Sequence, residues 1–345
     1  MNGKNAYNGR MAPSQTIQQR YAGLVGGPAL IDRSNRALIE VTGRDRVAWA
    51  HNLTSNQVKT LGRDEGNYAF VLNAQGRILF DLNLVVRAES IWLDLDRRFL
   101  GAALKHFEKY IIMEDVRVAN RSEVFARFAI AGEKVKGVLA DLGAANAAAM
   151  PLISMTTVPF GQTALDILRS DFCGVFAAEL FVPAALAASL KSELTNRHGL
   201  IQIDDQVVQI RRIEAGIPWP GAELTDEVLP AETRQMERAV SFQKGCYLGQ
   251  EIVERMRARK VVAKVLCGLR IDGDAIPLPG GELIADGGAV VGKLTSACLS
   301  VALSAVIGLG YVKSGSAIRN TQLQVRLGDK TVGATVTELP FVTRA

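Results

Sequence analysis

The chain has 345 residues, 48% hydrophobic and 22% charged, which is long enough for roughly two or three domains with buried cores. Its net charge of +5, from 40 basic and 35 acidic residues, is too small to predict stable nucleic-acid binding but suits an anionic ligand. No apolar run is long enough to cross a membrane and the polar N-terminus is not a secretory signal, so we expect a cytoplasmic protein.

The N-terminal residues 1–28 are mostly polar and predict a flexible arm. Residues 29–122 alternate like strands, then carry apolar residues at helical spacing, and end in strand-like runs and an amphipathic helix. Residues 123–204 repeat this order of strand pairs and helices. Because strand pairs packed on helices are typical of α+β proteins, we expect two α+β modules of related design.

The pattern changes after Lys260, where short runs rich in Val, Leu and Thr are broken by glycine pairs and show no helical period. We expect residues 261–345 to form a small β-barrel or β-sandwich. Residues 205–260 link the second module to this domain and hold the most unusual residues of the chain. Polar and charged residues are mixed throughout the sequence, so a monomer is expected.

Cys246 stands out among the four cysteines, in the stretch SFQKGCYLGQEIVERMRARK. It follows Lys244 and precedes the expected start of a helix. The lysine charge and the positive end of the helix dipole both favour a thiolate, which is a stronger nucleophile and metal ligand than a thiol. The alternative is a small apolar residue buried in a turn. The four cysteines are scattered singly along the chain, so they predict neither a disulfide framework nor a metal site. Core burial is expected for the other cysteines, which lie in apolar strand-like runs: Cys173, Cys267 and Cys298.

Two further features carry carboxylates. The segment Arg211–Glu232 is irregular and rich in Pro, Gly and acidic residues, so it is either a structural loop pinned by Arg–Glu pairs or part of a site. Asp81 stands alone among apolar neighbours in RILFDLNLVV. It either faces solvent, opposite Phe80 and Leu82, or lines a pocket where it binds a heterocycle or transfers a proton.

Four segments together resemble the superfamily of the glycine-cleavage T-protein, the folate-dependent aminomethyltransferase. They are TGRDRVAWAHNLTSNQV, LNAQGRILFDLNLVV, RRIEAGIPWPGAELTDEVLP and FQKGCYLGQEIVER, within a resemblance that runs from about Ala29 to Thr337. The motif from Lys244 to Glu251, followed by Arg255, resembles the YgfZ branch of this superfamily. Proteins of that branch bind folate and support the assembly or repair of iron–sulfur clusters, and the resemblance also implies a link to tRNA modification.

The resemblance implies a fold of three domains around a central opening that holds tetrahydrofolate or a derivative. Two interlaced α+β modules, the first completed by about residues 205–260, are expected beside a C-terminal antiparallel β-barrel. Asp81 matches the aspartate beside the reactive nitrogens of folate, and Glu179 matches the glutamate that binds the pterin ring, whose N–H donors suit a carboxylate. Further folate contacts are implied for residues near the thiol: Tyr247, Gln250, Glu251 and Arg255.

The sequence departs from the T-protein at four places. Phe80 and Asp81 replace its Asp-Asp pair, Val208 replaces a folate-contacting arginine, and RSDFCGVF replaces the second half of its TGYTGE loop. The thiol motif is also foreign to the T-protein. These departures disfavour ordinary aminomethyl transfer, whereas the retained Asp81 is compatible with some one-carbon chemistry on folate.

We therefore expect a tetrahydrofolate-binding accessory protein for iron–sulfur client or assembly proteins, with Cys246 and Lys244 as its functional pair. One cysteine cannot hold a cluster, so it would act with a partner or as a redox-sensitive nucleophile. The alternative is an aminomethyl- or methyltransferase that uses Asp81 to handle a proton. The basic run Arg255, Arg257, Arg259 and Lys260 suggests a solvated helix face, or a contact with the glutamate tail of folate, an acidic partner or RNA.

Overall fold

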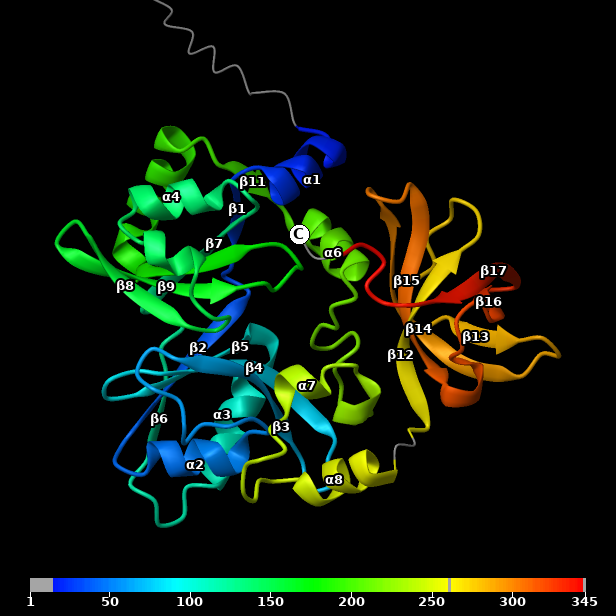
Figure 1. The fold of residues 1–345 in the computed structure, drawn as a ribbon, viewed down its shortest axis with the longest axis horizontal. Helices are drawn as coiled ribbons and strands as arrows, with labels where there is room; N and C mark the ends of the chain where they lie inside the picture. The colour runs from blue at the N-terminus through cyan, green and yellow to red at the C-terminus, as the bar shows by residue number, and fades with distance from the viewer. Residues whose placement is uncertain (1–14, 260–261, 344–345) are drawn as a thin grey trace, which may run out of the picture.

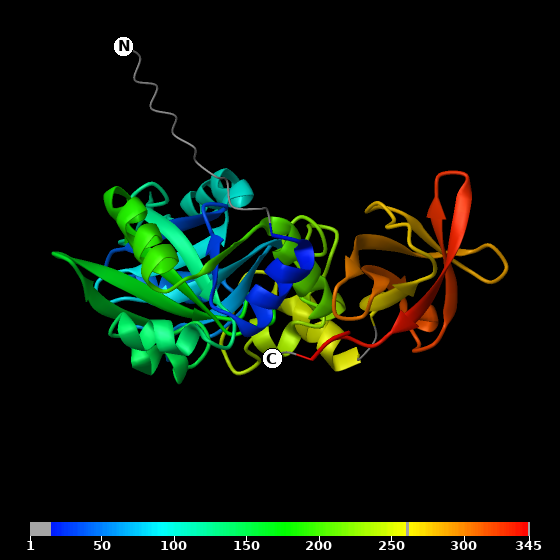
Figure 2. The same cartoon turned by 90° about the horizontal axis from the view of Figure 1, so that it is seen from above.

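A computed structural model describes residues 15–259 and 262–343 and contains two β-sheets and a closed β-barrel. Figure 1 shows the sheets one above the other and the barrel beside them, with α6 (Asp205–Glu214) and α7 (Met236–Ala239) in the central region. The view from above in Figure 2 shows the same separation between the barrel and the two-sheet part. Among the described residues, no helix is long and apolar enough to cross a membrane.

The first sheet has five antiparallel strands and carries Asp81. Side chains alternate along β4 (Ile78–Val86), so Phe80, Leu82 and Leu84 enter the core while Asp81 points to the opposite face. Helices α2 (Arg46–Leu53) and α3 (Leu100–Lys109) complete this core. In sheet order, the strands are β3 (Gly66–Leu72), β4, β5 (Ile91–Asp96), β2 (Arg36–Thr42) and β6 (Arg117–Asn120).

The second sheet has six strands and carries Glu179. In sheet order they are β11 (Ile201–Ile203), β1 (Ala29–Asp32), β7 (Phe125–Ala131), β10 (Ala177–Pro183), β9 (Thr163–Ser170) and β8 (Met155–Phe160). The helices that accompany this part of the chain are α1 (Ile17–Gly26), α4 (Val135–Asp141) and α5 (Ala187–Ser192). The core contains Leu139 of α4 and Leu190 of α5 together with residues of the sheet.

The expected limits of the arm and of the first module need correction. Residues Ile17–Gly26 form α1, because Thr16 and Gln19 close a capping box at its start. Residues 1–14 of the predicted arm lie outside the described residues. Strand β1 pairs antiparallel with β7 and parallel with β11, so residues 29–32 belong to the second sheet rather than the first. The two modules are thus interlaced already at their first strand.

The segment between the second sheet and the barrel contains α6, α7 and α8 (Gln250–Arg259). Helix α6, which the sequence analysis treated as part of a link, starts at the Asp204 cap and carries the buried Glu214. The Glu214 carboxylate accepts hydrogen bonds from Tyr21 of α1 and from Ser300 of the barrel. Helix α6 therefore ties the N-terminal helix and the barrel together.

The barrel is closed and antiparallel, which confirms the expected barrel and excludes the sandwich. In barrel order, its strands are β12 (Lys264–Ile271), β15 (Ala305–Lys313), β14 (Val290–Ser300), β13 (Glu282–Ala285), β16 (Gln322–Leu327) and β17 (Lys330–Thr337). After β17 the chain returns to α6, where the Val342 amide donates to the Glu214 carbonyl at 3.0 Å. Fold class and secondary-structure types thus follow the sequence expectation.

Candidate functional site

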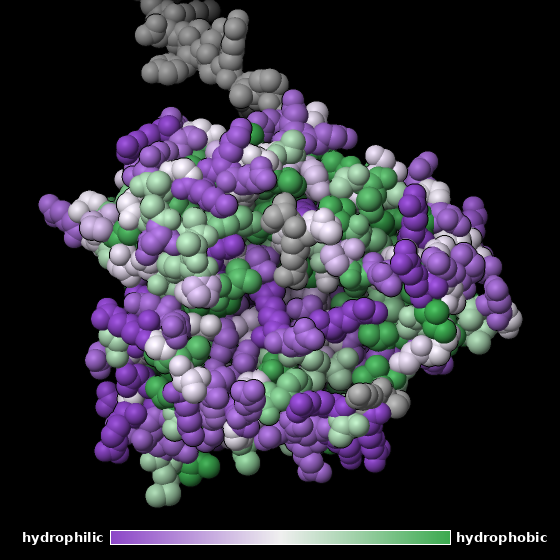
Figure 3. All heavy atoms as spheres, viewed as in Figure 1, coloured by the Kyte–Doolittle hydropathy of each residue, from purple (hydrophilic) through white to green (hydrophobic). Residues whose placement is uncertain are grey.

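A cavity lies between the two sheets and the segment 217–220. Both sheets and the central segment contribute to its lining, which includes Asp81, Arg33, Arg238, Tyr68, Phe172 and Trp219. In the space-filling view, hydrophilic residues gather around the hollow at the centre of the molecule (Figure 3).

Asp81 combines burial with an unused acceptor. Its side chain is 7% exposed, and Oδ2 accepts a hydrogen bond from the Tyr68 hydroxyl at 2.8 Å. Within the described chain, Oδ1 is buried without a hydrogen-bond partner. Burial raises the pKa of Asp81, although the Arg36 charge and the Tyr68 hydrogen bond oppose the rise. The solvent-facing alternative is therefore wrong, and Asp81 offers a ligand an acceptor that can hold a proton.

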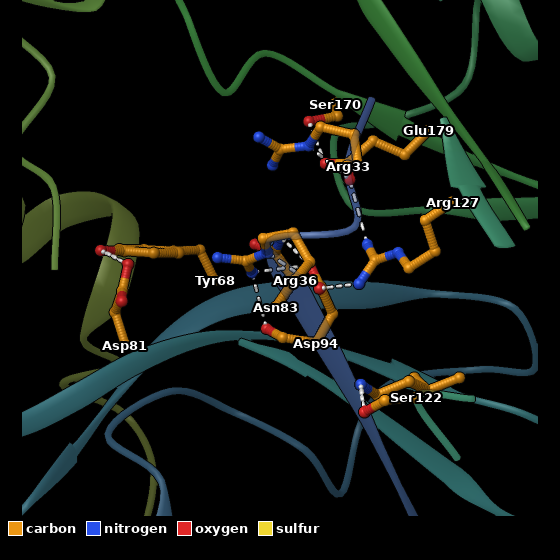
Figure 4. A network of polar contacts seen from close by, with 11 residues as sticks. Arg33, Arg36, Tyr68, Asp81, Asn83, Asp94, Ser122, Arg127, Ser170 and Glu179 are labelled. Carbon is orange, nitrogen blue, oxygen red and sulfur yellow. Dashed lines mark hydrogen bonds and ion pairs between the residues drawn. The ribbon is translucent and has the colours of Figure 1, made fainter. Parts of the chain in front are cut away.

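Arginines and aromatic rings share the lining. The Arg33 guanidinium lies 3.9 Å from the centre of the Phe172 ring, and its Nε donates to Glu179 at 3.2 Å. In Figure 4 the other end of this guanidinium points away from Glu179 into the space between the sheets. Arg238 of α7 lies 4.8 Å from the centre of the Tyr68 ring. This lining suits a planar ligand that also carries negative charge.

A buried charge network supports the cavity from behind (Figure 4). Arg127 of β7 donates to Asp94 of β5 at 2.5 Å and to Glu179 of β10 at 3.0 Å, so it joins the two sheets. Asp94 also accepts from Arg36 at 2.8 and 3.0 Å and from Asn83 at 2.9 Å. Burial raises the pKa of Asp94, but the charges of Arg127 and Arg36 outweigh this effect and hold that pKa well below its usual range.

The implied role of Glu179 as a pterin ligand does not match its position. Glu179 is fully buried and accepts hydrogen bonds from Arg33, Arg127 and Ser170, at 3.2, 3.0 and 3.2 Å. Arg33 and Ser170 line the cavity, whereas Glu179 does not. The two arginines draw this carboxylate into the network, so it positions Arg33 instead of facing the cavity.

Cys246 is exposed, so the buried alternative for this residue is wrong. It lies on a loop, here called the Cys246 loop, that runs from Ser241 to Gly249. The turn before α8 uses Gly249, whose φ of 83° favours glycine. Core burial is confirmed for the remaining cysteines: Cys173, Cys267 and Cys298.

Lys244 anchors the Cys246 loop instead of pairing with the thiol. Its Nζ donates to the carbonyls of His51, Thr54 and Asn56 at 2.6, 2.5 and 2.8 Å, which uses all three N–H bonds of an ammonium group. Burial, with a smaller contribution from the Lys59 charge, lowers the pKa of Lys244 to about 7. The three carbonyl acceptors act in the opposite direction, because they favour the ammonium form.

The other residues of the motif also lie away from the central cavity. Tyr247 is 7% exposed and packs in a core that includes Phe70 of the first sheet and Leu266 of the barrel, and burial raises its pKa. The Gln250 side chain accepts from the Tyr247 amide at 3.2 Å. Glu251 and Arg255 are exposed on α8. None of these four residues lines the cavity that contains Asp81.

The acidic segment and the basic run have structural contacts. Glu223 is fully buried and accepts from Arg212 at 2.7 Å, which confirms a loop pinned by an Arg–Glu pair. This loop also places Trp219 in the cavity lining, a role that its carboxylate pattern did not signal. In the basic run, Arg257 is exposed and lies 4.1 Å from the centre of the Phe242 ring, whereas Lys260 lies outside the described residues.

Sequence reasoning also missed Arg33, Tyr68 and Arg238 as lining residues. They come from the β1–β2 connection, β3 and α7, and none belongs to a motif that marks function locally. Val208, which stands where the T-protein has a folate-contacting arginine, is buried with Leu24 and other apolar residues. The arginines of this cavity therefore come from other elements.

Comparison with known proteins identifies the family. The chain has the fold of the glycine cleavage system aminomethyltransferase T from Bartonella henselae, with a TM-score of 0.86 and 21% identity over 95% of this chain and 90% of that one. The family model described as GCVT N-terminal domain matches residues 5–244, and that of the glycine cleavage T-protein C-terminal barrel domain matches residues 264–343. The chain belongs to the glycine-cleavage T-protein family.

Relatives in this family are distant but match over most of their length. An aminomethyltransferase of Herpetosiphon aurantiacus is 25% identical over 332 residues, which cover 93% of this chain and 91% of the relative. A putative chloroplastic transferase of Arabidopsis thaliana is 26% identical over 321 residues, which cover 92% of this chain and 72% of the relative.

Proposed function

We propose that this chain binds tetrahydrofolate, or a derivative of it, in the central cavity. The observation that carries the proposal is Asp81, which lines this cavity in a chain of the T-protein family and whose Oδ1 is buried without a hydrogen-bond partner among the described residues. A folate offers N–H donors to such an acceptor, flat rings to Phe172 and Trp219, and a carboxylate tail to Arg33. Each of these ligand groups has a partner of suitable chemistry in the lining.

Titration of the purified protein with tetrahydrofolate tests the proposal, with calorimetry as the readout. We expect saturable binding that Asp81→Asn weakens at least about tenfold, because a hydrogen bond to a charged group is lost. Asp286→Asn, a change of the same kind at an exposed barrel residue, serves as the matched control. Absence of binding to the wild-type protein would rule out the folate proposal.

We further propose that the folate-loaded protein assists iron–sulfur client or assembly proteins through Cys246, as in the YgfZ branch. Two observations support this finer assignment: the thiol is exposed, and Lys244 fixes the base of its loop through three backbone carbonyls. An exposed thiol on an anchored loop is accessible to a partner protein. Cys246 would then supply one ligand or one nucleophile, while the partner supplies the rest of the cluster environment.

Complementation separates this role from folate binding. In cells that lack the protein and show low iron–sulfur enzyme activity, we expect Cys246→Ala to fail in rescue while the purified variant keeps its folate affinity. Full rescue by this variant would remove Cys246 from the proposal. Gln243→Ala, at an exposed position of the same loop outside the motif, is the control for a nonspecific effect near the thiol.

A folate-dependent aminomethyl- or methyltransferase is the second candidate, and the raised pKa of Asp81 favours it. A carboxyl group that holds a proton nearer to neutral pH can exchange one with the folate nitrogen that bonds to the one-carbon unit. Single-turnover transfer to tetrahydrofolate distinguishes the two candidates. Turnover that Asp81→Asn lowers by about 10²-fold or more, with no effect of Cys246→Ala, would favour the transferase over the accessory protein.

A further inference from the structure

Three lysines meet on the outer face of the barrel, outside the site described above. Lys264 of β12 lies directly opposite Lys313 of β15 in the strand register. Lys293 of β14 lies opposite Tyr311, two residues before Lys313 on the same strand, so all four side chains share one face of the barrel. Like charges directly opposite each other on neighbouring strands are destabilising unless a counter-charge lies nearby.

These lysines line a groove between the barrel and the segment 221–228. We call it the barrel groove. Segment 221–228 forms one wall with Ala222, Thr225 and Val228, and Pro279 and Gly280 close another side. The groove and the central cavity meet neighbouring residues of the chain, since Pro220 lines the cavity and Gly221 lines the groove.

Carboxylates lie near the barrel groove, but within residues 15–259 and 262–343 none forms an ion pair with Lys264, Lys293 or Lys313. Glu282 lies opposite Lys293 in the strand register, and its carboxylate pairs with Arg326 at 2.6 Å. The Lys264 charge also acts on Glu232, and Glu227 is the one acidic residue in the lining. Lys264 approaches only the Glu227 backbone carbonyl, at 3.4 Å, and lies 5.1 Å from the centre of the Tyr311 ring. Lys313 donates to the Val290 carbonyl at 3.0 Å and keeps further N–H bonds for a ligand.

We infer that the barrel groove binds a small anion that carries at least two carboxylate or phosphate groups. One such anion would lie among the three ammonium groups and remove the repulsion between Lys264 and Lys313. Two sources share this chemistry: a free anion, and the γ-glutamyl tail of a ligand whose rings occupy the central cavity. The inference about the groove does not depend on folate binding, because the lysines act on the anion alone.

Calorimetric titrations of the full chain with pyrophosphate and with penta-γ-glutamate, each alone and at low ionic strength, test the inference. We expect at least one of them to bind, and Lys293→Ala/Lys313→Ala to weaken that binding at least about tenfold. Lys293→Arg/Lys313→Arg keeps both charges and should retain binding within about threefold. Lys134→Ala/Lys191→Ala removes two exposed lysines elsewhere and should leave binding unchanged.

The source follows from a comparison of folates with one and with five glutamates. Tighter binding of the longer form, lost in Lys293→Ala/Lys313→Ala, assigns the groove to a ligand tail, whereas pyrophosphate binding without that difference assigns it to a free anion. The inference is overturned if neither anion binds, or if the control variant loses as much affinity as the groove variant. Failure of every folate to bind overturns the proposed function but leaves the two anion titrations as a valid test of the groove.

Discussion

Asp81 and Cys246 lie in two regions that the chain builds in opposite ways. Asp81 is 7% exposed and lies near a buried network in which Arg127 joins the two sheets. Cys246 is exposed on a loop that is held by the contacts of Lys244 with three backbone carbonyls and by backbone hydrogen bonds at the two ends of the loop. Buried charges near the cavity are therefore stabilised by opposite charges, whereas the Lys244 ammonium beneath the loop is stabilised by backbone carbonyls.

The buried network and the exposed loop suit different functions. A buried network keeps its groups in one arrangement, which suits recognition of a ligand and control of a proton at Asp81. An exposed thiol on an anchored loop suits contact with another molecule. The two segments of the family resemblance that contain Asp81 and Cys246 therefore lie in different places in the structure, and each place has its own test.

The buried network should be the most sensitive feature. Arg127→Ala leaves Asp94 and Glu179 without a shared partner, so we expect the free energy of unfolding to fall by about 3–5 kcal/mol. Arg121→Ala, which removes an exposed pair with Glu40 at 2.8 Å, should cost less than about 1 kcal/mol. Urea denaturation measures both, and equal losses would mean that burial gives the Arg127 pairs no special weight.

The lysine anchor should come next. Lys244→Met keeps an apolar stem but leaves three carbonyls without their donor, so we expect a loss of about 2–3 kcal/mol in unfolding free energy. Lys134→Met, at an exposed position, should change stability by less than about 0.5 kcal/mol. Faster reaction of Cys246 with a thiol reagent in Lys244→Met would show that the loop itself is released, and an unchanged rate and stability would contradict the anchor.

Substitution of Asp81 should increase the free energy of unfolding, in contrast to the two substitutions above. Asp81→Asn keeps an acceptor for Tyr68 but removes a buried negative charge, so we expect a gain of about 1 kcal/mol at pH 7. Burial raises the pKa of Asp81 in the folded state above its value in the unfolded chain. Between these two pKa values the folded wild-type protein binds more protons than the unfolded chain, so it becomes more stable as pH falls.

The advantage of Asp81→Asn should therefore shrink between pH 7 and about pH 4, near the ordinary pKa of an aspartate. Urea denaturation at both pH values measures the change. An advantage that grows on acidification would mean that the charged form is stabilised in the fold, contrary to the effect of burial.

The smallest effect is expected at the thiol. Cys246→Ser should change the unfolding free energy by less than about 0.5 kcal/mol, because the side chain is exposed. Cys173→Ser places a hydroxyl in a fully buried position and should cost about 1–3 kcal/mol. A thiol reagent should modify one cysteine in the native protein and four after unfolding, and rapid modification of a second native thiol would contradict the burial of the other three.

Local patterns in the sequence were sufficient for the element types and for the barrel. Alternation along β4 separated Phe80 and Leu82 from Asp81 correctly, because neighbouring side chains of a strand point to opposite faces. Short runs broken by glycines likewise identified the barrel strands between Lys264 and Thr337. The pairing of β1 with β7 was not predictable in this way, since no local pattern names a partner about a hundred residues away.

The sequence by itself determined the family resemblance, the barrel, and the two residues on which the proposals depend, Asp81 and Cys246. Only the tertiary structure decided that Glu179 faces two arginines instead of the cavity, and that Lys244 binds carbonyls instead of supporting the thiol. The physical reason is the distance along the chain between partners: Lys244 and Thr54 are 190 residues apart. Motif spacing reports local neighbours, whereas burial and hydrogen bonding depend on which distant segments fold against them.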